Sequence, residues 1–161
     1  PEPIIHGAGT RIMSLRDGTK KMSKSDPSDF SRITLTDSAE TIAKKIQKAK
    51  TDPLNLPNDV QELDGRPEAR NLINIYASLT DTSVTQVISE MQDASFKNFK
   101  SKLTELAVET LAPISQEINK LLNNPSYIDE ILDEGSEKAR NLSTPVVNRA
   151  YEIVGLLSTK K

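Results

Sequence analysis

Apolar side chains recur every three or four residues along most of this chain, from Asp37 onward. This spacing places them on one face of an α-helix, and it is found in about five or six successive stretches. The first stretch contains Ile42 and Ile46 and opens with a capping-box-like pair, Asp37 and Glu40, while the longest runs from Phe96 to Leu121. Because an amphipathic helix must bury its apolar face against another element, this part of the chain predicts an all-α helical bundle.

Capping residues, prolines and glycines mark the ends of these predicted helices. Ser83 has the position of a helix N-cap, and Pro67 suits the first residue of a helix. Pro113 lies inside the longest stretch and predicts a kink there, because proline removes one backbone donor. Gly135 predicts a break between the last two helices, and Pro145 predicts a kink or restart within the final one.

The first 35 residues follow a different pattern, with several prolines and glycines and no helical period. The segment Ile12–Leu15 predicts one short strand, and the alternation around Ile33 predicts a second extended piece. Residues 51–66 carry two further prolines and few apolar side chains, so we expect a connecting loop there with one turn of helix. The chain is therefore expected to have two parts, with the boundary between residues 35 and 36.

Composition excludes several kinds of site. The chain has no cysteine and one histidine, His6, which excludes disulfides, thiolate zinc sites, cysteine nucleophiles and His-rich metal sites. A formal net charge of −2 excludes a protein that coats nucleic acid by charge alone. The apolar runs are too short for a membrane span, and Pro1-Glu2-Pro3 does not open a signal peptide, so we expect a cytoplasmic protein with no membrane partner.

One predicted loop is crowded with three lysines and two serines: Lys20, Lys21, Ser23, Lys24 and Ser25. Gly18 upstream and Pro27 downstream make the loop non-helical. Rotatable ammonium groups and hydroxyls on such a loop suit a polyphosphate, and the loop can close on charge that develops during phosphoryl or adenylyl transfer. Residues 11–26 contain five basic and two acidic side chains, a local charge of +3. From composition alone, an ordinary solvated loop is the commoner interpretation.

The order of these residues is more specific than their composition. Residues 21–25 read Lys-Met-Ser-Lys-Ser, the KMSKS signature of class I aminoacyl-tRNA synthetases. The flanking segments Gly9–Leu15 and Lys20–Pro27 resemble the tryptophanyl-tRNA synthetases, and the resemblance continues to the end of the chain in six blocks: Thr41–Ile46, Ala49–Asp52, Arg66–Leu72, Phe99–Lys100, Glu109–Ile114 and Ile131–Arg140. The class I tyrosine enzymes are relatives, and the continuation Ser25-Asp26-Pro27 favours tryptophan.

The resemblance implies a reaction and a set of residues. The family activates tryptophan with ATP, with Mg²⁺ on the phosphates, and then transfers it to tRNA(Trp). Lys24 and Lys21 are implied as catalytic residues that stabilise the leaving pyrophosphate. The implied ATP-binding residues are Ile12, Lys21, Met22, Ser23, Lys24 and Ser25.

Each remaining ATP-binding residue has an implied task. Ser23 and Ser25 are hydrogen-bond donors, and Met22 anchors the loop on apolar surface. Ile12 matches the position where the backbone meets the adenine, a task that any residue can perform through its own amide. No residue is assigned as a metal ligand.

The sequence also departs from the family. The other ATP signature, of the His-x-Gly-His type, is missing, because His6-Gly7-Ala8-Gly9 does not match it and only 20 residues precede Lys21. We therefore expect the C-terminal half of a synthetase, inactive by itself. Residues 1–35 are then the tail of a Rossmann-type catalytic domain with the signature loop, and residues 36–161 an anticodon-binding helical domain. The fragment is expected to be a monomer, and the intact enzyme a homodimer.

The alternative function is a non-catalytic helical module that binds nucleic acid or protein through the basic loop. Such a module needs only the charge of the loop, whereas a synthetase needs the order of its residues. We interpret Phe96 and Phe99 as core, His6 as a surface residue, and the acidic residues between 129 and 137 as a solvated face rather than a metal site. Candidates for contact with tRNA phosphates are Lys97, Lys100, Lys102, Arg140 and Arg149.

Overall fold

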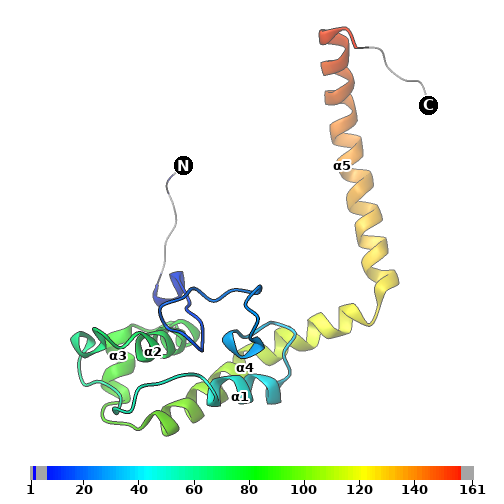
Figure 1. Cartoon of the computed structure of the whole chain (residues 1–161). Helices are drawn as coiled ribbons and strands as arrows, with labels where there is room; N and C mark the ends of the chain where they lie inside the picture. The colour runs from blue at the N-terminus through cyan, green and yellow to red at the C-terminus, as the bar shows by residue number, and fades with distance from the viewer. Residues whose placement is uncertain (1, 3–6, 157–161) are drawn as a thin grey trace. The chain divides into compact units, whose positions relative to one another are not determined.

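The computed structural model describes residue 2 and residues 7–156 of the chain (Figure 1). Within these residues it contains five α-helices: α1 (Ala39–Gln47), α2 (Pro67–Thr80), α3 (Val84–Glu90), α4 (Phe96–Leu122) and α5 (Pro125–Val154). It also contains three short 3-10 helices: η1 (Ala8–Thr10), η2 (Asp29–Ser31) and η3 (Val60–Leu63). The prediction of an all-α architecture is confirmed, and η3 is the single turn expected within residues 51–66. None of the described helices is long and apolar enough to cross a membrane.

The predicted strand does not form in the described part of the chain. The segment Ile12–Leu15 contributes only an isolated antiparallel bridge between Met13 and Lys21. The pairing stops there because Lys20, whose backbone N–H would continue the ladder by donating to Ser14, donates it instead to the carbonyl oxygen of Asp17 at 3.1 Å. The segment around Ile33 is predicted only to be extended, and it joins no ladder with the described residues, so the expectation of a strand is wrong for Ile12–Leu15 alone.

The chain divides into two compact units, Pro1–Glu117 and Ile118–Lys161. The first unit contains α1, α2, α3 and most of α4, and the second contains the end of α4 and α5. Within the first unit, the segment before residue 36 shares a core with the helices, since Leu15 is 2% exposed. The functional boundary between residues 35 and 36 stays a prediction.

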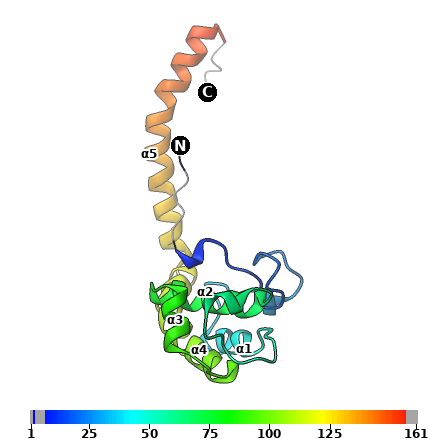
Figure 2. The same ribbon diagram turned by 90° about the vertical axis from the view of Figure 1, so that its left-hand side faces the viewer.

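The core of the first unit lies between α1, α2, α3 and the first part of α4, which are grouped together in two perpendicular views (Figures 1 and 2). The Phe99 ring packs at a tilt against the Tyr76 ring, with 5.5 Å between their centroids. Phe96 is also buried, so the prediction that both phenylalanines belong to the core is confirmed. The other large apolar side chains that are almost fully buried are Leu15, Ile42, Ile46, Leu63, Leu72, Ile73 and Leu103.

The ends of the helices follow the predicted capping residues with one exception. Ser83 accepts a hydrogen bond from the backbone of the first turn of α3, and Pro67 is the first residue of α2. At α1, however, the N-cap is Ser38 and not Asp37. The carboxylate of Asp37 is already occupied, because it accepts a hydrogen bond from the ammonium group of Lys45 at 2.7 Å.

Helix α5 continues through Gly135 and Pro145 without a break, so the predicted division of this segment into two helices is wrong. A glycine inside a helix costs about 1 kcal/mol relative to alanine, which is too little to end a helix of 30 residues. Pro145 removes one backbone donor, but the helix continues both before and after it. None of the described side chains of α5 is buried.

Candidate functional site

The signature loop, which we define as Lys20–Pro27, follows a tight turn against α2. Asp17 accepts hydrogen bonds from Thr19 through its side chain, at 3.0 Å from the backbone nitrogen and 2.6 Å from the hydroxyl, and these bonds lower the pKa of its carboxyl. A Cβ atom at Gly18 would lie 2.6 Å from the carbonyl oxygen of Pro67, so the backbone of the turn touches the first residues of α2. Only glycine allows this approach, and the start of the loop is thereby fixed on the helix.

Beyond the turn, the chain runs back beside the segment that carries Ile12. Ser14 donates its backbone N–H to the carbonyl oxygen of Lys20 at 2.8 Å, and Met22 donates its N–H to that of Ile12 at 3.1 Å. These two hydrogen bonds lie on either side of the bridge pair described above. The structure therefore brings together three of the predicted ATP-binding residues: Ile12, Lys21 and Met22.

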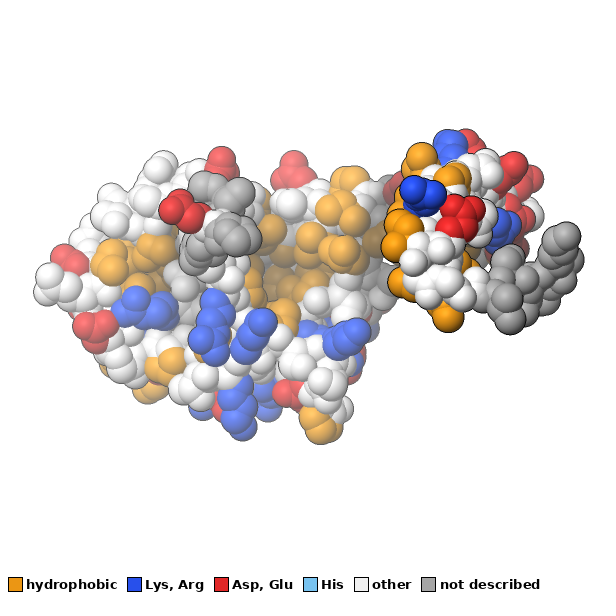
Figure 3. All heavy atoms as spheres, turned by 90° about the horizontal axis from the view of Figure 1, so that it is seen from above, with side chains coloured by type: hydrophobic (Ala, Val, Ile, Leu, Met, Phe, Trp, Pro, Cys, Tyr) orange, Lys and Arg blue, Asp and Glu red, His pale blue; other side chains and the backbone are white. Residues whose placement is uncertain are grey.

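Met22 is half-buried and packs against the core. With Ile12 it lines an open apolar hollow of about 220 Å³, whose floor includes Ile75 and Leu79 of α2 and Leu111 of α4. This is the position expected of a residue that anchors the loop on apolar surface. Figure 3 shows Lys and Arg side chains gathered on the same unit next to an apolar area.

The centre of the signature loop is exposed. The hydroxyl oxygens of Ser23 and Ser25 lie 3.0 Å apart, and the backbone N–H of Ser25 donates to the Ser23 hydroxyl at 3.3 Å. Lys21 and Lys24 are exposed, and neither forms an ion pair with another described residue. Both ammonium groups are therefore available to an anionic ligand.

A buried lysine, Lys45, holds the segment that follows the signature loop. The Lys45 ammonium group is bonded to the carboxylates of Asp29 at 2.9 Å and Asp37 at 2.7 Å, and its side chain is 1% exposed. Burial favours the neutral amine, but the hydrogen bonds that the ammonium group donates to both carboxylates outweigh it and raise the pKa of Lys45. Burial likewise opposes ionisation of Asp37, but the hydrogen bonds from Lys45 and Thr34 lower the pKa of its carboxyl.

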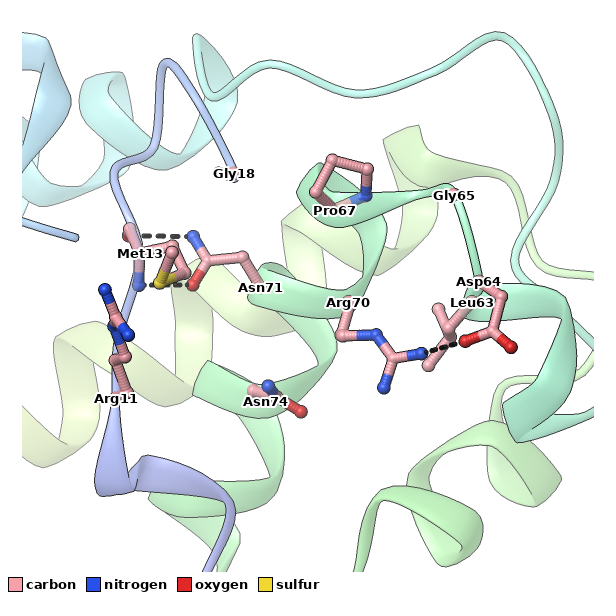
Figure 4. A pocket seen from close by; sticks show the side chains of 10 residues that line it. All are labelled: Arg11, Met13, Gly18, Leu63, Asp64, Gly65, Pro67, Arg70, Asn71 and Asn74. Carbon is pink, nitrogen blue, oxygen red and sulfur yellow. Dashed lines mark hydrogen bonds and ion pairs between the residues drawn. The ribbon is translucent and has the colours of Figure 1, made fainter. Parts of the chain in front are cut away.

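A second hollow, of about 510 Å³, lies beside the turn (Figure 4). It is open to solvent, and α2 contributes Arg70, Asn71 and Asn74 to its lining. The Asn71 amide oxygen accepts the backbone N–H of Met13 at 2.8 Å, and the amide nitrogen donates to the carbonyl oxygen of Met13 at 2.8 Å. Sequence reasoning assigned no role to Asn71, although it lies in the resembling block Arg66–Leu72 and is a polar residue beside Leu72 in the apolar stripe of the predicted helix.

One candidate for tRNA contact is used inside the protein instead. Lys100 is 8% exposed, and its ammonium group donates to the carbonyl oxygens of Gln47 at 3.1 Å and Ala49 at 2.7 Å. It closes the C-terminal end of α1, where backbone carbonyls lack partners within the helix, and burial lowers the pKa of Lys100. The expectation that Lys100 faces tRNA is therefore wrong. The prediction for His6 falls outside the described residues.

Comparison with known proteins identifies a family. The family described as tRNA synthetases class I (W and Y) matches residues 1–112 of the chain. The chain is 52% identical over 156 residues to the tryptophan–tRNA ligase of Agrobacterium fabrum, which covers 97% of this chain and 44% of that protein. It is 48% identical over 155 residues to the tryptophan–tRNA ligase of Caulobacter vibrioides, with coverages of 96% and 45%.

Solved structures give the same result for the fold. A crystal structure of tryptophanyl-tRNA synthetase from Campylobacter jejuni superposes with a TM-score of 0.68 at 27% identity, covering 97% of this chain and 46% of that one. A second structure from the same organism, complexed with ADP and tryptophan, superposes with a TM-score of 0.68 at 28% identity, with coverages of 91% and 44%. The chain thus spans less than half the length of the relatives that it matches.

Proposed function

The chain belongs to the class I tRNA synthetases (W and Y), and from this premise we propose that it is the C-terminal part of a tryptophan–tRNA ligase. The observation that carries the proposal is the 52% identity to such a ligase over 97% of the chain. The intact enzyme uses ATP to activate tryptophan and then charges tRNA(Trp). By itself this part is inactive and monomeric, and the intact enzyme is a cytoplasmic homodimer.

In the proposed mechanism, the signature loop acts on the first of two steps. An oxygen of the tryptophan carboxylate bonds to the α-phosphorus of ATP, and the bond from that phosphorus to the bridging oxygen breaks, so that pyrophosphate leaves. Lys24 and Lys21 donate charged hydrogen bonds to the pyrophosphate oxygens as negative charge collects there. The exposure of both ammonium groups supports this role. In the second step a ribose hydroxyl of tRNA attacks the tryptophanyl carbonyl, and AMP leaves.

Adenine recognition is assigned to the paired segments. The backbone of Ile12 meets the adenine, and Met22 packs beneath it, which is supported by the hydrogen bond between their backbones and by the apolar hollow that they share. Ser23 and Ser25 exchange their mutual hydrogen bond for bonds to phosphate oxygens.

Mg²⁺ is assigned no protein ligand in this part of the enzyme. The described residues contain no group of three His, Cys, Asp or Glu side chains that could hold a metal ion.

The substrate assignment is tested by pyrophosphate exchange in an intact ligase that contains this chain. We expect tryptophan to support the exchange of labelled pyrophosphate into ATP, and tyrosine to support it at a negligible rate. Exchange with tyrosine and not with tryptophan would overturn the assignment. A signature loop in which the order of the Lys and Ser residues is shuffled keeps its charge, so unchanged exchange with that variant would contradict the catalytic role of the loop and favour a loop that acts through its charge alone.

A further inference from the structure

Met13 has two hydrogen-bonding edges, and they serve different partners. On the loop side, the bonds between Ser14 and Lys20 and between Met22 and Ile12 enclose the pair formed by Met13 and Lys21. Met13 and Lys21 are thus a non-hydrogen-bonded antiparallel pair. Each residue of such a pair points its own N–H and carbonyl away from the other segment. The backbone amide groups of Met13 are therefore left for a partner on the opposite side.

The side chain of Asn71 is that partner. Its oxygen accepts a hydrogen bond from the Met13 N–H, and its nitrogen donates one to the Met13 carbonyl oxygen, both at 2.8 Å (Figure 4). Its nitrogen also lies 3.3 Å from the carbonyl oxygen of Ser14. A carboxamide reproduces the donor and acceptor of a peptide group, so Asn71 takes the place of a third strand. Asn71 is 2% exposed, so these hydrogen bonds are shielded from solvent.

We propose that Asn71 is a positioning residue for ATP, acting through Met13 on the signature loop. This inference rests on the proposed function, since it concerns the same ATP site. The link runs from Asn71 of α2 to Met13, and from there across the bridge to Lys21 and Met22. The side-chain hydrogen bonds of Asn71 go to Met13 and Ser14 and not to the proposed ATP-binding residues, so Asn71 acts by setting the register at which Ile12 and Met22 meet. Its substitution therefore weakens the binding of ATP without altering the binding of tryptophan.

The sharpest variant is Asn71→Asp, which keeps the shape of the side chain and the acceptor for the Met13 N–H. It loses the donor, and a carboxylate oxygen then faces the carbonyl oxygens of Met13 and Ser14. The matched control is Asn74→Asp, which adds the same charge on the same helix, in the lining of the same hollow. The Asn74 side chain has no hydrogen bond to the Met13 segment.

The experiment is tryptophan-dependent pyrophosphate exchange in the intact ligase, with KM measured for each substrate. We expect Asn71→Asp to raise the KM for ATP about tenfold, the effect of one lost positioning hydrogen bond, and to change the KM for tryptophan less than twofold. Asn74→Asp should change neither. If Asn71→Asp behaves like the control in an enzyme that is active with tryptophan, the inference is wrong and the proposed function stands. If the unsubstituted enzyme shows no exchange with tryptophan, the proposed function itself fails.

Amide hydrogen exchange in this chain alone provides a readout that is independent of activity. In Asn71→Asp, the N–H of Met22 should exchange at least about tenfold faster, while the N–H of Phe99 in α4 keeps its rate. Unchanged protection of Met22 would contradict the link. If the aspartate variant does not fold, Asn71→Ser takes its place, because its side chain is shorter and has one polar atom where Asn71 uses two, and the same two results are expected.

Discussion

Helices α2 and α5 have similar amphipathic sequences and opposite surroundings. Leu72 and Ile73 of α2 are almost fully buried, whereas Leu142 of α5 is 78% exposed and α5 has no buried side chain among its described residues. The repeat of apolar residues is therefore enough to specify a helix in both places, but only the first unit contains the partners that bury it. Amphipathicity therefore predicts that a helix has an apolar face, but it does not predict which element packs against that face.

The polar side chains of the two units differ in the same way. In the first unit, Lys45, Asn71 and Lys100 are buried and each bonds to groups distant in sequence. In α5 the ion pairs are exposed and local, such as Lys138 with Glu134 at 2.6 Å. Exposed pairs of this kind contribute at most a few tenths of a kcal/mol, whereas buried polar groups require their partners. The site therefore lies in the unit whose geometry is fixed by such contacts.

The largest expected contrast comes from truncating one apolar side chain in each unit. Phe99→Ala should destabilise the first unit by about 3–5 kcal/mol, because Phe99 is fully buried and its removal leaves a cavity. Leu142→Ala should change stability by less than about 0.5 kcal/mol. Urea denaturation followed by circular dichroism measures both. Similar losses for the two variants would show that α5 is buried in solution.

Replacing a glycine by alanine should change the free energy of unfolding in opposite directions in the two units. Gly18→Ala should cost about 1–3 kcal/mol, since the new Cβ overlaps the backbone of Pro67 and Glu68. Gly135→Ala meets no atom within 4 Å and lies inside α5, so it should stabilise that helix by up to about 1 kcal/mol. Thermal unfolding of the two variants compares them directly. Stabilisation by Gly18→Ala would mean that the turn does not touch α2.

A smaller effect is expected from the dependence of folding stability on pH, through Asp37 of the first unit. Asp37 has a folded-state pKa below its ordinary value of 3.8, because the hydrogen bonds from Lys45 and Thr34 outweigh its burial. The unfolded chain therefore binds a proton at Asp37 more readily than the folded chain. Its contribution to stability is present above about pH 4 and is lost as the pH falls through the lowered pKa. Asp37→Asn should flatten the acid limb of a stability–pH curve, and an unaltered slope would refute the pairing.

Much of this architecture could be predicted from local sequence signals. Ser83 and Pro67 mark helix starts because capping and the fixed φ of proline act within one turn. The burial of Phe96 and Phe99 follows from helical spacing alone. For the site, the order of the signature residues identifies the loop from the sequence, and the structure places Ile12 beside Met22. Their roles in ATP binding stay proposals.

The remainder depends on contacts that spacing does not encode. Lys45 and Lys100 look like surface lysines of helices, and their burial is decided by carboxylates and carbonyls brought in by other segments. Asn71 is likewise recognisable only once the Met13 segment lies against α2. The continuity of α5 was missed because the cost of Gly135 is small against a long helix.

The central claim is that Lys24 stabilises charge developing on pyrophosphate, and Lys24→Ala tests it most directly in an intact ligase that contains this chain. The matched control is Lys20→Ala, which removes the same charge from a lysine that pairs with Asp17 at 3.3 Å. We predict that Lys24→Ala lowers the rate of tryptophan-dependent pyrophosphate exchange by about 10²–10³, the size of one lost transition-state contact, and that Lys20→Ala lowers it less than about threefold. Equal effects of the two variants, or a loss below about threefold for Lys24→Ala, would contradict the account.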